Sequence, residues 1–226
     1  MPSWNITLPK GRCEMKRWIA IAALGLAVLH ANGASADPMA TDISTLSHAW
    51  AKVYYQTSEQ SQEAAFPALV AQADAVAKAY PAKAEPMIWQ AIILSSYAKA
   101  KGGLGAVALA EQARDIALAA AKIDEKALNA GAYTSLGALY YKVPGWPIGF
   151  GSDKKAKEYL DRAVAIAPES IDVNYFYGDF MIEQGDKAKA REFLQKALQS
   201  PARPGREDAD AGRKEEIMAD LAKLKG

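Results

Sequence analysis

The feature that most constrains this fold is a near-repeat in the C-terminal half of the chain. Four residues, Ala156, Leu160, Ala163 and Pro168, recur as Ala190, Leu194, Ala197 and Pro201. The alanines and leucines return after 34 residues (156 to 190, 160 to 194), and only the prolines drift, to 33. A second set precedes each copy, namely Tyr133, Leu136, Gly137 and Tyr140, then Asn174, Tyr177, Gly178 and Met181. Each unit is expected to be a pair of helices that completes its core by stacking on a neighbour.

A period near 34 residues, with glycine within one helix and small residues within the other, resembles the tetratricopeptide repeat (TPR). The clearest repeats span 130–168 and 171–201. Val/Ile/Thr alternation is nearly absent, and proline and glycine divide the chain into helical segments. The sequence predicts an all-α, TPR-like solenoid of antiparallel hairpins with a C-terminal capping helix. About nine helices are expected, near 43–58, 64–80, 85–101, 104–123, 126–142, 153–167, 171–184, 187–199 and 208–224.

The ends of several helices carry further signals. Pro67 is expected in the first turn of the second helix, where a missing N–H is harmless. Asp153 and Asp186 are expected to cap the helices that follow them. The last helix is polar outside and apolar on one side, which is typical of a solenoid cap. Its apolar residues are Ile217, Met218, Leu221 and Leu224.

Residues 1–36 resemble a secretory signal peptide. Lys16 and Arg17 form a basic region, and residues 18–29 form an apolar run too short to span a bilayer comfortably. Residues 34–36, Ala-Ser-Ala, supply a small-x-small cleavage site. We expect cleavage after Ala36 and no membrane insertion afterwards. A membrane anchor is the alternative, although the apolar run ends early for one.

The mature protein is expected to be a single TPR-like helical domain over 37–226, and residues 1–14 are expected to be an over-extended start before Met15. Cleavage removes Cys13, the only cysteine, so no disulfide or lipid-bearing cysteine follows the signal. The expected compartment is exported and oxidising, most simply a bacterial periplasm. The remaining net charge of about −2 gives no indication of a nucleic-acid partner.

Few side chains in the mature sequence suit catalysis. His48 is the only histidine left, and no cysteine, second histidine or acidic cluster has metal-ligand spacing. A catalytic triad would have to recruit His48 from the first hairpin, where the repeat pattern has decayed, so a surface or packing histidine is expected. We therefore expect a non-enzymatic protein with no metal and no cofactor.

The concave face of the repeats is the candidate binding groove, since the first helix of each hairpin lines that side. The residues expected there are Thr134, Ala138 and Tyr141 in one unit and Asp172, Tyr175, Asp179 and Ile182 in the next. Two carboxylates would repel an anionic ligand, so a neutral, apolar or cationic segment fits better. The alternative is that the tyrosines only fill the space between helices. Arg203, Arg206 and Arg213 are expected to be solvated or salt-bridged.

The connection between the two helices of the first clear repeat carries an inserted loop. It is seven residues longer than its counterpart (140 to 156 against 181 to 190). Trp146, Ile148 and Phe150 make it too apolar for an ordinary solvated turn. One interpretation is a structured loop that folds its aromatic residues back onto the solenoid. The other is a lid or recognition element over the groove, because loops on rigid scaffolds often carry binding function.

The loop sequence 143–151, followed by residues 153–156 and the Asn-Tyr-Phe-Tyr-Gly run at 174–178, resembles the T component associated with TRAP-type transporters. The resemblance implies an all-α, non-enzymatic periplasmic accessory that associates with the substrate-binding component. It also implies homo-oligomers with a pore through each subunit for apolar ligands. The chain departs from that family in lacking a lipobox cysteine, which puts membrane tethering in doubt.

Two functions follow from these patterns. The first is a periplasmic TPR scaffold that binds a protein partner through its concave face and the 143–151 loop, as an accessory of a TRAP-type or other envelope transport system. The second is a carrier that holds a small apolar ligand between its helices. The sequence does not name the partner, the ligand or the oligomeric state.

Overall fold

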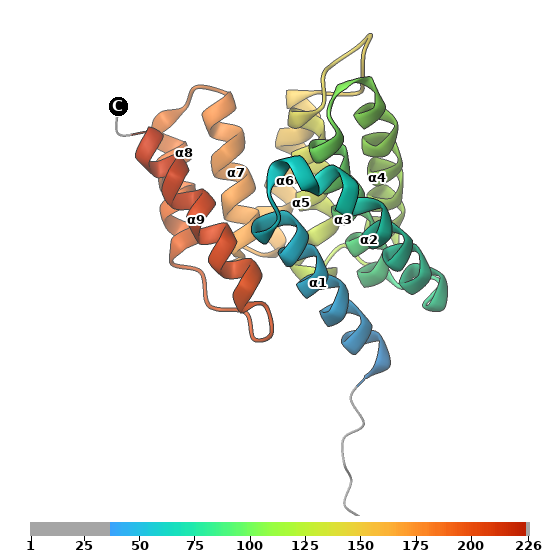
Figure 1. The fold of residues 1–226 in the computed structure, drawn as a ribbon. Coiled ribbons are helices and arrows are strands. Elements are labelled where there is room, and N and C mark those ends of the chain that lie inside the picture. The colour runs from blue at the N-terminus through green and yellow to red at the C-terminus, as the bar shows by residue number, and fades with distance from the viewer. Residues whose placement is uncertain (1–36, 225–226) are drawn as a thin grey trace, which may run out of the picture. The chain divides into compact units, whose positions relative to one another are not determined.

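The computed structural model describes residues 37–224, which form nine α-helices and, within that range, no strand (Figure 1). The helices are α1 (Pro38–Gln56), α2 (Glu59–Ala79), α3 (Ala84–Lys101), α4 (Gly103–Ile123), α5 (Ala127–Lys142), α6 (Asp153–Ile166), α7 (Ile171–Glu183), α8 (Lys187–Leu198) and α9 (Glu207–Lys223). The predicted all-α class is confirmed. The predictions for the signal peptide, its cleavage after Ala36 and the start at Met15 lie outside the described residues.

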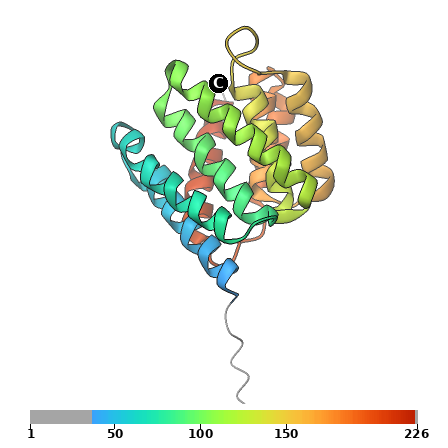
Figure 2. The same ribbon diagram turned by 90° about the vertical axis from the view of Figure 1, so that its right-hand side faces the viewer.

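Consecutive helices pair as hairpins, with α3 against α4, α5 against α6, and α7 against α8 (Figure 2). The repeated small and apolar residues are the core of this arrangement. The two triplets Ala156, Leu160, Ala163 and Ala190, Leu194, Ala197 are all 0% exposed. The near-repeat of the sequence is therefore a repeat of buried positions.

The α5–α6 and α7–α8 hairpins use the same close contact between their helices. A Cβ added at Gly137 would lie 2.6 Å from Leu160 Cγ, and one added at Gly178 would lie 2.8 Å from Leu194 Cγ. Side-chain size at the contact sets the distance between helix axes. The mid-helix glycines thus let each leucine of the second helix sit directly against the first helix.

The start of the second helix differs from the prediction. Instead of opening near residue 64, α2 begins at Glu59, and Pro67 lies inside it. The earlier start is stabilised by Gln62, whose side-chain amide donates to the main-chain oxygens of Tyr54 and Thr57 at the end of α1. The prediction that Pro67 occupies the first turn is wrong, because the helix already begins at Glu59, on the N-terminal side of the proline.

Two predicted caps have different outcomes. Asp186 caps α8, since its carboxylate accepts a hydrogen bond of 3.0 Å from the N–H of Lys189. Asp153 does not cap α6. Ser152 occupies that position and its hydroxyl accepts from the N–H of Lys155, while Asp153 lies in the first turn.

The last helix has more contacts than a terminal cap needs. Helix α9 packs against α7 and α8, and also against α1, so the first and last described helices touch (Figure 1). Its buried residues are Ala209, Asp210, Gly212, Arg213 and Ile217. Gly212 lies so close to the ring of Tyr55 on α1 that a Cβ there would overlap it. The predicted apolar face is wrong at Met218, which is 53% exposed, because the helix turns its glycine-containing face inward.

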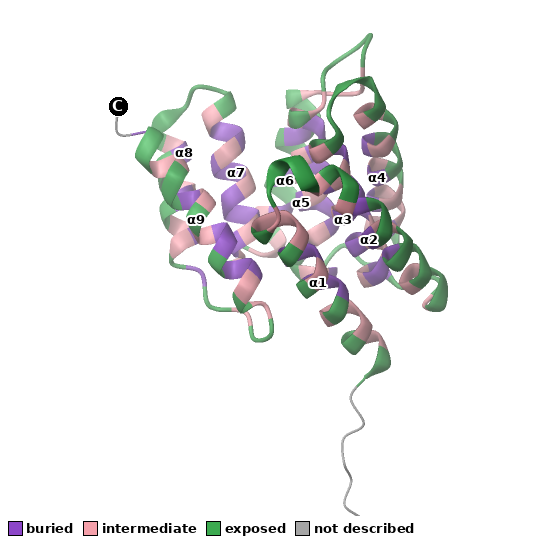
Figure 3. Cartoon of the chain, in the orientation of Figure 1, coloured by how far each residue is buried: buried purple, intermediate pink, exposed green. Residues whose placement is uncertain are grey.

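Burial follows the hairpins, with exposed residues along much of α2 and buried residues on the inner faces of α5 and α7 (Figure 3). Among residues 37–224, no helix combines the length and apolarity that a bilayer crossing requires.

Replacing Gly178 with alanine tests the close approach of α7 and α8. The new Cβ would meet Leu194 Cγ at 2.8 Å and the carbonyl oxygen of Ala190 at 3.3 Å. This overpacking outweighs the helix-propensity gain of about 1 kcal/mol. We expect Gly178→Ala to lower the free energy of unfolding by about 1–2 kcal/mol in a urea titration.

Gly105→Ala is the matched control, since its Cβ would meet only the flexible end of the Lys101 side chain. That variant should be neutral or more stable by about 0.5–1 kcal/mol. Equal unfolding midpoints for Gly178→Ala and the parent protein would contradict the packing argument.

Candidate functional site

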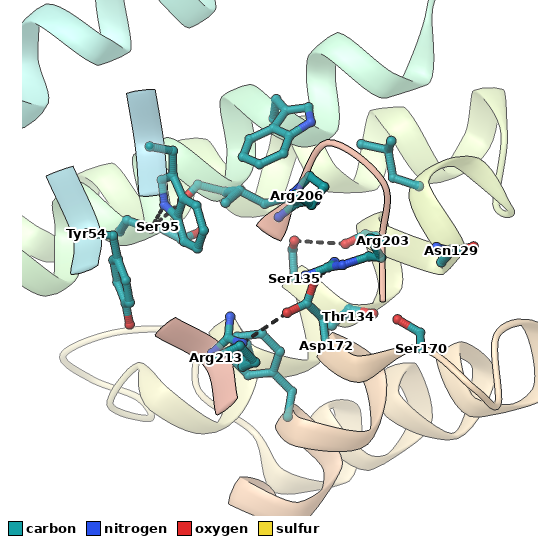
Figure 4. A pocket seen from close by; sticks show the side chains of 18 residues that line it. Tyr54, Ser95, Asn129, Thr134, Ser135, Ser170, Asp172, Arg203, Arg206 and Arg213 are labelled. Carbon is teal, nitrogen blue, oxygen red and sulfur yellow. Dashed lines mark hydrogen bonds and ion pairs between the residues drawn. The ribbon is translucent and has the colours of Figure 1, made fainter. Parts of the chain in front are cut away.

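The predicted groove contains an ion-pair cluster built by the chain itself. Asp172 on α7 accepts from Arg203 Nη1 at 2.6 Å and from Arg213 Nε at 3.0 Å. Arg203 also donates to Asp210, and Arg213 to Glu216 at 2.6 Å. The cluster ties α7 to the linker before α9 and to α9 itself (Figure 4). Two of the three arginines expected to be solvated or salt-bridged are therefore salt-bridged.

The electrostatics of Asp172 follow from these partners. Burial alone would raise the pKa of Asp172, but Arg203 and Arg213 outweigh it and hold that pKa well below its usual range. The Asp172 side chain is 27% exposed, and those of Arg203 and Arg213 are 20% and 6% exposed. The carboxylate is thus a fully ionised bridge, and its charge is already neutralised by the protein.

The remaining predicted groove residues are also engaged within the chain. Tyr175 is 8% exposed and lies beneath the guanidinium of Arg213, 4.2 Å from its ring centre. Tyr141 donates to Asp179 at 2.7 Å, and Lys142 binds the same carboxylate at 3.0 Å. Burial, and then Asp179, raise the pKa of Tyr141, so it stays a neutral donor.

Two adjoining cavities remain between the helices. The smaller, of about 160 Å³, has Thr134 and Asp172 in its wall, and the larger, of about 790 Å³, has Tyr175 and Asp179. Tyr141 and Ile182 line neither. The cavities share six lining residues, Tyr54, Ser95, Ser96, Ala138, Phe176 and Arg213. The predicted residues are thus gathered around one interior region, while α9 covers part of the face on which they lie.

The inserted loop divides its apolar residues between two roles. Phe150 packs edge-on against Tyr140 at 5.3 Å, with the guanidinium of Arg114 over its ring. Trp146 is 90% exposed, and Ile148 is 58% exposed and lines the larger cavity. The fold-back interpretation describes Phe150, whereas Trp146 and Ile148 are not folded back into the core.

Three features of this region were not predicted. Leu104, at the start of α4, is 82% exposed and lines the larger cavity together with Ile148. The sequence signal that could have indicated this exposed position is an apolar residue directly after the glycine pair Gly102-Gly103. The second feature is that Trp89 and Arg206 line the smaller cavity. No sequence pattern apart from their residue types pointed to this position.

The third unpredicted feature is a left-handed turn at the start of α5. Leu128, Asn129 and Ala130 have φ values of 50°, 54° and 59°. Such a conformation costs about 1–2 kcal/mol per non-glycine residue. Leu128 and Asn129 line the smaller cavity, so the unusual backbone lies at its wall.

Other chemistry in the described region is sparse. His48 Nδ1 lies 2.8 Å from Asp208 Oδ2 on a half-exposed surface, as expected for a surface histidine. Within residues 37–224, no group of three or more His, Cys, Asp or Glu side chains is placed to hold a metal ion.

Comparison with known proteins supports the repeat interpretation for part of the chain. Residues 154–204, from α6 to the linker before α9, match the family model of the tetratricopeptide repeat, which is less than half of the sequence. Among solved structures, the chain is similar to a thermophilic TPR protein of Thermus thermophilus, with 13% identity and a TM-score of 0.43 over 82% of this chain and 98% of that one. No curated protein sequence matches the chain.

Replacing Asp172 with asparagine tests the ion-pair cluster. The variant leaves Arg203 and Arg213 without their shared carboxylate, and we expect a loss of about 2 kcal/mol in the free energy of unfolding near pH 7. Because the folded-state pKa of Asp172 is depressed, its contribution is present above the unfolded-state pKa of about 3.9. The difference between the two proteins should therefore shrink as the pH falls below about 4.

Glu192→Gln serves as the control, since Glu192 is exposed and makes no ion pair among the described residues. It should change stability by less than about 0.5 kcal/mol. A Glu192→Gln loss as large as that of Asp172→Asn would show that the cluster is not what stabilises α9.

Proposed function

We propose that this protein is a non-enzymatic scaffold that binds a partner protein through the rim of the larger cavity. The observation that carries this proposal is the exposure of Leu104 and Ile148, both of which line that cavity, with Trp146 on the same loop. Exposed apolar clusters on soluble proteins mark interaction sites. Tryptophan in particular dominates the binding energy of many protein interfaces.

The rim is favoured over the concave face as the docking surface. Arg213 covers Tyr175, and Asp172 is occupied by two arginines, so neither side chain is free to contact an incoming segment. The rim residues have no such partners within the described chain. A partner would place apolar side chains between the 143–151 loop and the start of α4, over the mouth of the cavity.

Export and a role in transport belong to the same proposal. The basic, apolar and small-residue sequence of residues 1–36 supports periplasmic delivery. The resemblance of residues 143–151 to the TRAP T component supports an accessory of a TRAP-type or other envelope transport system, with its substrate-binding component as the partner and with homo-oligomers as a further state. The repeat match over 154–204 supports a binding rather than a catalytic role.

Trp146→Ala tests the docking surface. Truncating a central tryptophan commonly costs about 2 kcal/mol or more of binding free energy. We expect capture of the partner from periplasmic extract to fall at least about tenfold relative to the parent protein, with unchanged thermal unfolding. Surface plasmon resonance against the captured partner would measure the same loss.

Met218→Ala is the matched control, because Met218 is also exposed but lines neither cavity. Its capture should equal that of the parent protein. If Met218→Ala loses as much binding as Trp146→Ala, or if neither variant loses any, the rim is not the docking surface.

A second candidate function rests on the size of the larger cavity. Its volume of about 790 Å³ falls within the range of about 300–1,000 Å³ that small-molecule sites occupy. A carrier of a small apolar ligand would hold it there, and native mass spectrometry of the purified protein would show the additional mass.

Ala106→Phe tests the carrier, because Ala106 lines the larger cavity and not the smaller one. The added ring should fill the space and abolish the additional mass. Ala108→Phe, on the exposed side of the same helix, should retain it. A ligand retained equally by both variants would place it outside this cavity.

A further inference from the structure

We propose that the smaller cavity is a binding site for a small monocarboxylate with an apolar body. The inference goes beyond the proposed docking function, since it concerns the smaller cavity and none of the exposed rim residues. It rests on two buried donors without acceptors, on the one arginine of the cluster that forms no ion pair within the described chain, and on the walls of the cavity.

Two nitrogen donors of the cavity wall lack a partner. Trp89 is 1% exposed, and neither its Nε1 nor the buried Nε of Arg206 has a hydrogen-bond acceptor among the described residues. Both side chains line the smaller cavity, and the Arg206 guanidinium lies 4.9 Å from the Trp89 ring centre. A tryptophan nitrogen and a guanidinium can only donate, so each of them requires an acceptor.

One arginine of the cluster has no ion-pair partner at this place within residues 37–224. Arg203 is bound by Asp172 and Asp210, and Arg213 by Asp172 and Glu216. The three arginines and three carboxylates balance in charge, but the carboxylates are paired with Arg203 and Arg213, and Arg206 forms no ion pair among the described residues. Burial, and then Arg203 beside it, lower the pKa of Arg206, so a bound anion would stabilise its charged form. Figure 4 shows Arg206 next to Arg203 at the cavity.

This arrangement reverses the expectation drawn from the sequence. Asp172 was expected to repel anions from the groove, but it is shared between Arg203 and Arg213. What the cavity presents instead is a guanidinium. A single guanidinium without an ion pair matches a ligand with a single negative charge better than a doubly charged phosphate.

The remaining walls specify the body of the ligand. Trp50, Ile92, Leu128 and Phe176 line the cavity around the donors. A volume of about 160 Å³ is close to that of a cavity that holds benzene, about 150 Å³. A single aromatic ring or a short alkyl chain therefore fits, and a longer tail can continue into the adjoining larger cavity.

Binding of benzoate, followed by isothermal titration calorimetry on the purified protein, tests this site. Benzamide has the same shape and no charge, so we expect it to bind at least about tenfold more weakly than benzoate. Arg206→Met should weaken benzoate by at least about tenfold. Arg162→Met, which removes an exposed arginine paired with Glu158, should leave it within about twofold.

Three further measurements separate the possible results. Trp89→Phe removes the Nε1 donor and should weaken benzoate severalfold. Inorganic phosphate should not displace benzoate at equal concentration. Trp146→Ala should leave benzoate binding unchanged, so a failed docking surface does not imply a failed cavity site.

The proposal is overturned if benzoate does not bind at millimolar concentration, or if benzamide binds as tightly. Equal affinity of Arg206→Met and the parent protein, or displacement of benzoate by phosphate, would also overturn it. If Arg206→Met does not fold, the comparison of benzoate with benzamide on the parent protein decides.

Discussion

The carboxylate of Asp172, shared between Arg203 and Arg213, is the interaction on which the C-terminal part of the structure depends. It joins α7 to Arg203 in the linker after α8 and to Arg213 in α9. Helix α9 is thereby held across the repeats, where Arg213 covers Tyr175 and Gly212 meets Tyr55. The positions of the two cavities follow, because α9 contributes Arg213 to both and its linker contributes Arg203 and Arg206 to the smaller.

This placement of α9 changes where the protein can meet other molecules. An open TPR array offers its concave face, and here side chains of the chain itself occupy much of it. What remains accessible is the apolar rim formed by Leu104, Trp146 and Ile148. What remains inside is a cavity whose one charged group without an ion pair among the described residues is Arg206, although the sequence pattern indicated acidic walls. The two surfaces have different chemistry and suit different partners.

The repeat could be predicted from the sequence because local spacing encodes it. Each hairpin buries an alanine of its second helix, Ala156 or Ala190, and a glycine of its first helix, Gly137 or Gly178. These small residues recur because both hairpins need the same close contact between their helices. The position of α9 could not be predicted in this way. The pairing of Asp172 with Arg213 joins residues 41 apart in sequence, and no periodic pattern records it. Pro67 was misplaced for a different reason, since the bonds of Gln62 to the end of α1 are local but belong to no repeat pattern.

The contact between α1 and α9 has a consequence for how the helices respond to perturbation. In a linear repeat array each unit touches only its neighbours, so the ends fray first and the array can lengthen by duplication. Here the two ends brace each other through Tyr55 and Gly212. Loosening the first helix exposes the last, so melting should proceed as one cooperative event rather than from the tips. An additional hairpin inserted between them would have to break that brace, which limits the number of units this architecture accommodates.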